Sequence, residues 1–230
     1  DPGHHRAGVP AGEPACRLAL EVARLPGLRV RGLFTHEGHA NAAPPEQIEE
    51  IARAAGRAMA ETAERIRSQG LVIEAVSVGS TPAAAYTPTV PGITEMRPGT
   101  YVFRDASGFR YGIYGPDRCA ARIVATVVSR PAPDRAVLDS GSKVLALDTT
   151  PSHPGHGYIV GHERAIIARL SEEHGVVIVP PDETDLRVGD RVEIIPNHVC
   201  PTVNLTDELL VLRDGRVTDV WKVAARGKVR

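Results

Sequence analysis

The sequence predicts an α/β half followed by a β domain. Up to about residue 105, helical patterns alternate with short apolar strands, which is typical of βαβ units around a parallel sheet. From residue 118 onward, short β-rich runs separated by turns dominate. The spacing of roughly 30–45 residues per unit fits either a (β/α)8 barrel or a doubly wound sheet. We therefore assign residues 1–110 to the α/β part and residues 111–230 to the β domain.

The composition is that of a chain that can form a hydrophobic core, without features typical of nucleic-acid-binding or membrane proteins. Hydrophobic residues make up 42% of the 230 positions, and the formal net charge is −1 with no basic or acidic block. This argues against nucleic acid and membrane surfaces as main partners. The three cysteines are far apart and odd in number, which suits a reducing compartment. With no long apolar run and no signal-peptide pattern, we expect a cytoplasmic protein.

Local signals define each element of the α/β part. Pro44-Pro45 opens a long helix, and Gly70 follows its expected C-terminal end. Apolar side chains at helical spacing predict an earlier helix, and β-type runs predict the strands. The expected elements are a helix over 13–25, a strand over 28–34, a helix from Pro44 to about Gln69, a strand over 72–78, and a short helical stretch with a Pro-rich loop before 95–103.

The second part has the character of a β domain. Asp214-Gly215 between two apolar runs is a hairpin signal. Glu163 to Glu173 has the only helical pattern here, although a bulged strand fits it almost as well. The expected strands cover residues 121–130, 136–147, 176–179, 191–195, 208–212 and 216–223.

Polar and glycine-rich segments follow the strands of the α/β part, where parallel architectures bind their ligands. These segments are residues 1–6, 35–39, 79–81 and 97–100. Gly79-Ser80-Thr81 offers backbone N–H groups and two hydroxyls, and a helix start just after it would complete a phosphate cradle. Ordinary turn chemistry explains any one segment alone, but four in succession favour a site. No dinucleotide or Walker motif is present, which disfavours a nucleotide.

His198 and Cys200 are the candidate metal ligands. They follow the strand over residues 191–195, and continued strand geometry would place both on one face. Imidazole and thiolate are common zinc donors, and two of them leave coordination positions open. Taken locally, a buried Cys beside a hydrogen-bonded His is the simpler reading, because no CxxC or HxxxH completes a four-ligand site. A Cys protease would need a His base elsewhere in the chain, and nothing local supports that reading of Cys200.

Five segments, in this order, resemble the fold-type III pyridoxal-phosphate enzymes of the D-threonine aldolase and D-serine dehydratase family. That family joins an alanine-racemase-like (β/α)8 barrel to a D-serine-dehydratase-like β domain, and the resemblance covers nearly the whole chain. The segments are Asp1-x-Gly3-x-x-Arg6-x-Gly8-Val9, Gly79-Ser80-Thr81-Pro82, Arg97-Pro98-Gly99-x-Tyr101-Val102-Phe103, Ser171-Glu172-Glu173-His174-Gly175 and Pro196-Asn197-His198-x-Cys200-Pro201-Thr202.

The resemblance implies a pyridoxal 5′-phosphate site at the strand ends. It implies that Arg6 lies near the phenolic oxygen or the ring and that His36 packs against the pyridine ring. Arg97 matches the position that faces the pyridine nitrogen, where an arginine leaves that nitrogen unprotonated and weakens the electron sink. It further implies that Ser80 and Thr81, with the backbone of Gly99 and Thr100, hold the phosphate. The implied cofactor-binding set is Arg6, His36, Gly79, Ser80, Thr81, Arg97, Gly99, Thr100 and Tyr101.

The resemblance also implies a metal-assisted lyase. His198 and Cys200 would bind one divalent ion, zinc or manganese, and together with His36 they form the implied catalytic set. The substrate would be a small β-hydroxy-D-amino acid, cleaved either by elimination to ammonia and a keto acid or by retro-aldol reaction to glycine and an aldehyde. The His-x-Cys pair favours elimination, because the aldolase pattern has Asp at the position of Cys200. A homodimer is implied for the full-length form.

The chain departs from this pattern in its lysines. The family's Schiff-base lysine lies on the first barrel strand, whereas Lys143, Lys222 and Lys228 all fall in the β domain. We therefore expect that the chain is the C-terminal portion of the enzyme. By itself it should bind the cofactor weakly and should not catalyse the reaction. A complementing chain or a catalytically dead paralogue would also account for the missing lysine.

Two alternatives to the lyase stay open. An amino-acid racemase would have no use for His198 and Cys200, and no β-domain tyrosine stands in the racemase context. A non-catalytic pyridoxal-phosphate-binding protein shares the barrel but lacks an appended β domain. Among the other histidines, His4 and His5 either line the site or are merely exposed, and we expect His153 and His156 to be solvated in their Pro/Gly-rich loop.

Overall fold

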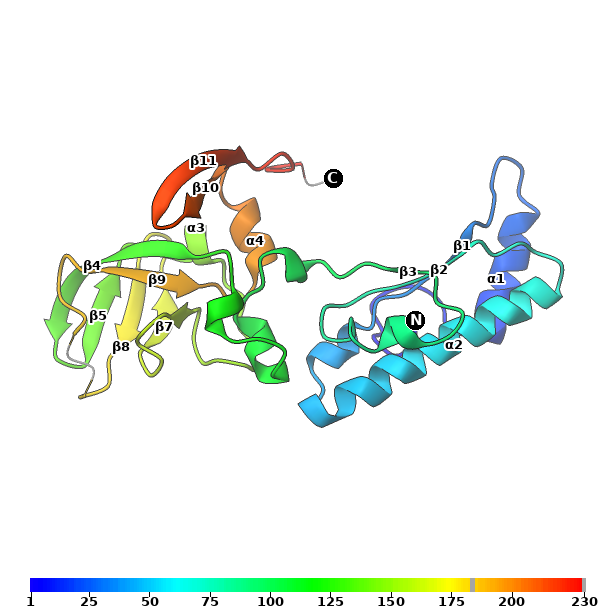
Figure 1. Ribbon diagram of the computed structural model, residues 1–230, viewed down its shortest axis with the longest axis horizontal. Coiled ribbons are helices and arrows are strands. Elements are labelled where there is room, and N and C mark those ends of the chain that lie inside the picture. The colour runs from blue at the N-terminus through cyan, green and yellow to red at the C-terminus, as the bar shows by residue number, and fades with distance from the viewer. Residues whose placement is uncertain (183–184, 229–230) are drawn as a thin grey trace. The chain divides into compact units, whose positions relative to one another are not determined.

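The computed structural model describes residues 1–182 and 185–228. It divides into two compact units, unit 1 (Asp1–Tyr101) and unit 2 (Val102–Arg230), which are described separately (Figure 1). No helix within the described residues combines the length and the apolar character that a membrane span needs.

Unit 1 is built on a parallel three-stranded sheet in the order β1-β2-β3. Leu33 pairs with Val76, and Ser77 pairs with Glu95, so the three strands end at a common edge. This arrangement confirms the predicted βαβ units, although each strand is shorter than the sequence suggested. The elements of unit 1 are α1 (Glu13–Ala23), β1 (Gly32–Phe34), α2 (Ile48–Ser68), β2 (Ala75–Val78) and β3 (Glu95–Met96).

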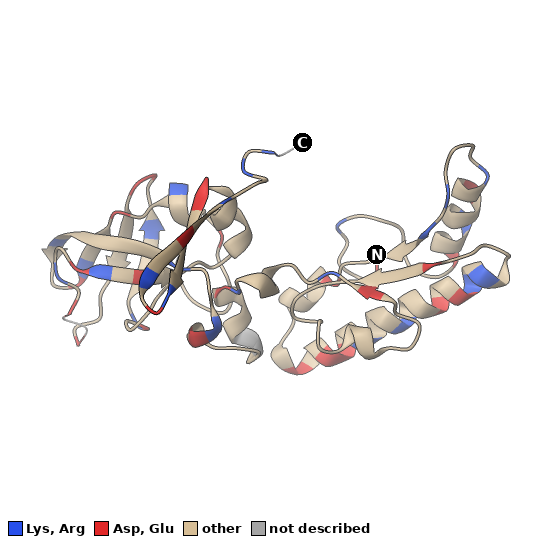
Figure 2. Ribbon diagram, turned by 45° about the horizontal axis from the view of Figure 1, so that its top comes forward, with Lys and Arg blue, Asp and Glu red and all other residues tan. Residues whose placement is uncertain are grey.

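Helix α2 shows why the long helix was predictable. A 3-10 turn over Pro45–Gln47 precedes it, and Gly70 adopts φ +89°, a left-handed conformation that ends the helix. Acidic side chains occupy its first turn and basic ones its last, which complements the helix dipole (Figure 2). Its apolar face packs into the core of unit 1. That core comprises Cys16, Ala19, Met59, Ala63, Ile66, Ile73 and Val76.

Unit 2 contains a six-stranded antiparallel sheet in the order β6-β9-β4-β5-β8-β7 and a separate hairpin, β10-β11. Asp214 and Gly215 both have positive φ in the hairpin turn, as their sequence predicts. The elements of unit 2 are β4 (Ile123–Ala132), β5 (Arg135–Leu138), α3 (Ser142–Leu145), β6 (Tyr158–Ile159), β7 (Ile166–Leu170), β8 (Gly175–Ile178), β9 (Arg191–Ile195), α4 (Val199–Asn204), β10 (Glu208–Arg213) and β11 (Arg216–Lys222).

Two predicted segments of unit 2 have a different structure. The helical reading of residues 163–173 is wrong, and the bulged-strand alternative is confirmed, because β7 pairs with β8 through a register shift between Ile167 and Arg169. The expected strand over residues 136–147 divides into β5 and the short helix α3. The carbonyls of Ser171 and Glu172 accept hydrogen bonds from the first N–H groups of α3, a contact between residues distant in the sequence.

Candidate functional site

The ends of β1 and β2 bring two predicted segments into direct contact. His36 Nδ1 is hydrogen-bonded to the carbonyl oxygen of Gly79. The backbone N–H of Gly79 donates to Glu37 Oε2 over 3.1 Å, and the Glu37 side chain is fully buried. The Thr35–His39 and Gly79–Thr81 segments are therefore joined at the edge where parallel sheets bind their ligands.

Gly79 is required by the close approach of β3. A Cβ at this position would lie 2.8 Å from the carbonyl oxygen of Arg97 and 2.9 Å from its nitrogen, and both are backbone atoms. Gly99 differs, because a Cβ there would meet nothing within 4 Å. The first glycine thus allows strand packing, and the second leaves its backbone open to a ligand.

The hydroxyls at this edge have different partners. Thr81 Oγ1 and Thr100 Oγ1 lie 2.7 Å apart, which joins the second and third strand ends. Ser80 is 3% exposed, and its hydroxyl accepts a hydrogen bond from the N–H of Ala83 over 3.3 Å. The helix expected just after Thr81 is absent, because turns continue to the 3-10 helix Thr87–Thr89. The predicted contribution of a helix N-terminus directly after Thr81 is therefore wrong.

Arg97 lies across the three strand ends. Its Nε donates to Ser77 Oγ over 2.6 Å, and its Nη2 donates to the carbonyl oxygen of Thr35 over 2.6 Å. The guanidinium carbon also lies 5.3 Å from the ring centroid of Phe34, a side chain that is 77% exposed. These contacts fix the cation beside the open face of the sheet.

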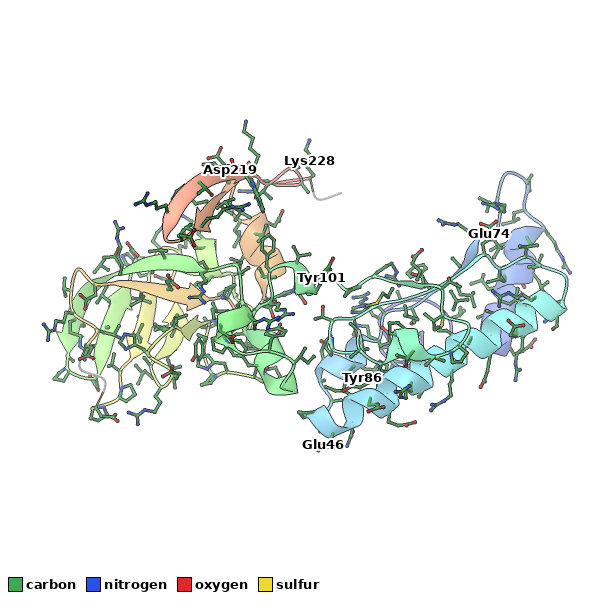
Figure 3. All side chains as sticks on the ribbon, in the orientation of Figure 1. Glu46, Glu74, Tyr86, Tyr101, Asp219 and Lys228 are labelled. Carbon is green, nitrogen blue, oxygen red and sulfur yellow. The ribbon has the colours of Figure 1, made fainter. Side chains whose placement is uncertain are left out.

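Other cofactor candidates of unit 1 are only partly brought together. A cavity of about 470 Å³ is lined by Arg6, Thr35 and His36, among other residues. His4 packs edge-on against His36 with 5.6 Å between ring centroids, so it is site-lining, whereas His5 is exposed. Tyr101, labelled in Figure 3, ends unit 1 with its side chain 58% exposed.

Three buried polar atoms that the sequence did not single out lie in the segment after β1. They are Thr35 Oγ1, Glu37 Oε1 and His39 Nδ1, and none has a hydrogen-bond partner among the described residues. Burial, with a smaller contribution from nearby His4, lowers the pKa of His39. Orphaned buried polar groups require an explanation, and a ligand or water at this edge is the usual one. The sequence signal for these atoms is the polar cluster Thr35–His39 itself, in which the resemblance singles out only His36.

In unit 2, His198 and Cys200 do come together, but not on a strand. His198 has extended backbone and is the N-cap of α4, and Cys200 lies in the first turn of that helix. The strand geometry assumed for this pair is therefore wrong beyond Ile195. The hydrogen bond to Cys200, assisted by one to Asp148 and opposed by burial, raises the pKa of His198 to about 9.

Asp148 is the site residue that the sequence analysis missed. Its Oδ1 lies 2.7 Å from Nδ1 of His198, fifty positions further along the chain. The only sequence signal was a carboxylate at the end of an apolar run. Within the described residues, no group of three or more His, Cys, Asp or Glu side chains is arranged to hold a metal ion. His198 and Cys200 thus form a two-donor pair with Asp148 beside the imidazole.

Buried polar contacts fix the segment that carries this pair. Asn197 is 2% exposed, and its Nδ2 donates to the carbonyl oxygens of Asp148 (3.0 Å) and Gly155 (2.7 Å). Asp105 is fully buried and accepts a hydrogen bond from the N–H of Val199 over 3.0 Å. The backbone on both sides of His198 is therefore held in place.

The prediction that His153 and His156 are solvated is wrong for His153. Its side chain is 9% exposed and packs edge-on against Tyr158, with 5.4 Å between ring centroids. His156 is partly buried, and its Nδ1 has no partner among the described residues. The loop is Pro/Gly-rich because Gly155 and Gly157 pass close to β7 and β9, and this packing encloses the histidines.

Two families match the chain in succession. The alanine racemase N-terminal domain matches residues 1–107, and the putative serine dehydratase domain matches residues 120–212. The chain is 34% identical over 233 residues to D-threonine aldolase from an Arthrobacter species. The alignment covers 99% of this chain and 59% of that protein. The chain therefore spans less than two thirds of the length of that relative.

Solved structures agree with these matches. D-threonine aldolase from Filomicrobium marinum superposes with a TM-score of 0.88 at 32% identity, covering 100% of this chain and 62% of that one. A cysteine-to-alanine mutant of D-threo-3-hydroxyaspartate dehydratase, in a metal-free form, superposes with a TM-score of 0.85 at 26% identity, covering 96% and 63% of the two chains. These neighbours confirm the predicted fold class, the C-terminal part of an alanine-racemase-like barrel followed by a β domain.

Proposed function

Because the chain belongs to the fold-type III family that joins an alanine-racemase-like barrel to a D-serine-dehydratase-like β domain, we propose that it serves a pyridoxal-phosphate-dependent, metal-assisted lyase acting on β-hydroxy-D-amino acids. The observation that carries the proposal is the pairing of His198 with Cys200 at the start of α4. A racemase has no step that uses this pair. Relatives named as aldolases and dehydratases of such amino acids support the substrate class.

The residues of unit 1 fit the phosphate and ring of the cofactor. Thr81 and Thr100 present adjoining hydroxyls, and the backbone at Gly99 is open for close approach. The orphaned atoms of Thr35 and Glu37 offer further polar contacts at the same edge. Bound pyridoxal phosphate would supply an electron sink for the substrate's α-carbon.

The roles of the other unit 1 residues follow from their contacts. Ser80 stabilises the turn, because its hydroxyl bonds back to the N–H of Ala83. His36 is oriented by the Gly79 carbonyl and would pack against the cofactor ring. Arg97, held by Ser77 and Thr35, would supply a permanent cation near the pyridine nitrogen of a bound cofactor. Arg6 and Tyr101, both exposed, complete the proposed cofactor set.

The donors of unit 2 fit one divalent ion, zinc or manganese. Imidazole and thiolate select zinc most readily, and two protein donors leave positions for water and substrate. A bound ion would act as a Lewis acid toward the substrate's β-hydroxyl. His198 must release one ring proton to bind the ion, because its raised pKa keeps the ring charged at neutral pH.

Metal content tests the proposal first. The purified chain is analysed by plasma mass spectrometry, with His198→Ala and Cys200→Ala as test variants and exposed His174→Ala as the matched control. We expect about one zinc or manganese per chain in the wild type and control, lost in both test variants. Absence of bound metal after supplementation with either ion overturns metal assistance.

The reaction is tested in a chimera in which residues 1–230 replace the aligned 59% of the Arthrobacter aldolase. D-serine and D-threonine are offered with their L-enantiomers as controls, and circular dichroism reports folding. Keto acid and ammonia indicate elimination, whereas glycine and aldehyde indicate retro-aldol cleavage. Interconversion of enantiomers without cleavage, in a folded chimera, favours the racemase instead.

A further inference from the structure

Asp148 and His198 form a specific pair within unit 2. Asp148 follows α3, and His198 follows β9, so the contact of 2.7 Å between Oδ1 and Nδ1 joins two elements distant in sequence. Both side chains are about half-exposed, which leaves the imidazole accessible from solvent. The same ring also interacts with Cys200.

The chemistry of the pair sets the tautomer of the ring. An ionised carboxylate can only accept hydrogen bonds, so the Nδ1 atom of His198 must carry a hydrogen and donate it. Nε2 is then the only ring nitrogen whose lone pair can reach a cation once its own proton has left. A histidine that binds a metal commonly donates its other N–H to a carboxylate, which fixes the ring orientation and increases ligand basicity.

The backbone around the pair is held by buried contacts. Asn197 donates one amide hydrogen to the carbonyl of Asp148, so the residue preceding His198 also anchors its carboxylate partner. On the other side, Asp105 accepts the N–H of Val199, and Ser107 hydrogen-bonds to Asp105. The two ends of the Asp148–His198 contact are therefore positioned before any ligand arrives.

We propose that Asp148 is a positioning residue, which fixes the Nδ1–H tautomer and the orientation of His198 so that Nε2 faces a divalent ion beside Cys200. The inference rests on the proposed metal site of His198 and Cys200. In this proposal Asp148 acts through the histidine, to which its Oδ1 is hydrogen-bonded, and does not bind the ion itself. Its removal weakens the site without abolishing it.

Zinc affinity of the whole chain, measured by competition with a chromophoric chelator, tests this inference. Asp148→Ala and Asp148→Asn are expected to lower the affinity by about 10–100-fold, with partial recovery in Asp148→Glu. Asp134→Asn is the matched control, because Asp134 is an exposed carboxylate in the turn between β4 and β5 of the same unit. Its affinity should equal that of the wild type.

Nitrogen-15 spectra of the ring provide a readout that is independent of affinity. In the zinc-saturated wild type, His198 should carry its hydrogen on Nδ1 and the metal on Nε2. In Asp148→Ala, that assignment should be lost or mixed with the opposite tautomer. After cobalt substitution, the wild type and Asp148→Ala should show the same number of protein ligands to the ion.

The outcomes separate the two proposals. If His198→Ala and Cys200→Ala leave zinc affinity unchanged, the metal site itself fails. If those variants lose zinc while the Asp148 variants keep both wild-type affinity and tautomer, the metal site stands and the positioning role is overturned. If Asp148→Ala loses zinc as completely as His198→Ala, and cobalt spectra show one ligand fewer, Asp148 is a ligand and the positioning role is again wrong.

Discussion

The backbone N–H of Gly79 donates a hydrogen bond to the carboxylate of Glu37, a side chain with no exposed surface. This 3.1 Å contact joins the residue after β2 to a residue three positions after β1. It holds together two of the segments that carry proposed cofactor contacts.

Replacing Glu37 should destabilise unit 1. Glu37→Ala leaves the buried N–H of Gly79 without a partner, which costs about 1–3 kcal/mol of unfolding free energy. Glu37→Gln keeps an acceptor oxygen and should cost less. Urea denaturation measures both against Glu61→Ala, an exposed position within α2. A wild-type midpoint for Glu37→Ala would show that the contact does not stabilise the unit.

Gly79→Ala and Gly99→Ala form a second matched pair. The added methyl at residue 79 meets the Arg97 backbone at 2.8 Å, and overpacking of this kind costs about 1–3 kcal/mol. The methyl at residue 99 meets nothing within 4 Å, so Gly99→Ala should fold normally. We expect it instead to weaken pyridoxal-phosphate binding, measured by absorbance titration. Equal stability of the two variants would contradict the packing argument.

Metal affinity should increase with pH. Hydrogen bonding to Cys200, followed by that to Asp148, raises the pKa of His198 to about 9, so the ion competes with a proton at neutral pH. Each pH unit below that value should reduce the apparent affinity about tenfold or more, because at least one proton is released on binding. Chelator competition between pH 6 and pH 9 measures the slope. A flat profile would mean that no proton is displaced from His198.

Unit 2 should lose stability in mild acid through His153. Burial lowers the pKa of this histidine from 6.5, with a smaller opposing effect from the Gly157 backbone. Because the unfolded state binds the proton more readily, this contribution is complete above pH 6.5 and is lost as the pH falls through the folded-state pKa. Urea midpoints at pH 7.5 and pH 5 should differ less in His153→Phe, which keeps the ring contact with Tyr158. An unchanged difference would assign the acid sensitivity to other groups.

Local chemistry made several features readable from the sequence. Pro44-Pro45 and Gly70 mark the ends of α2, because proline suits a helix start and glycine a left-handed end. The Asp214-Gly215 turn and the strand Arg191–Ile195 were predicted for similar reasons. The motifs at the strand ends and the His-x-Cys pair also identified the family, because they are short and contiguous.

Contacts between distant residues were not readable in this way. The bulged strand β7 looks helical by its own periodicity and becomes a strand only through its pairing with β8. Asp148 reaches His198 across fifty positions, and Glu37 reaches Gly79 across forty-two. The sequence by itself determined the fold class, the alternation of helices and strands in unit 1 and the residue types of the candidate site. Only the tertiary structure decided which carboxylates and histidines are buried and what they contact, because burial and hydrogen bonding depend on neighbours that packing supplies.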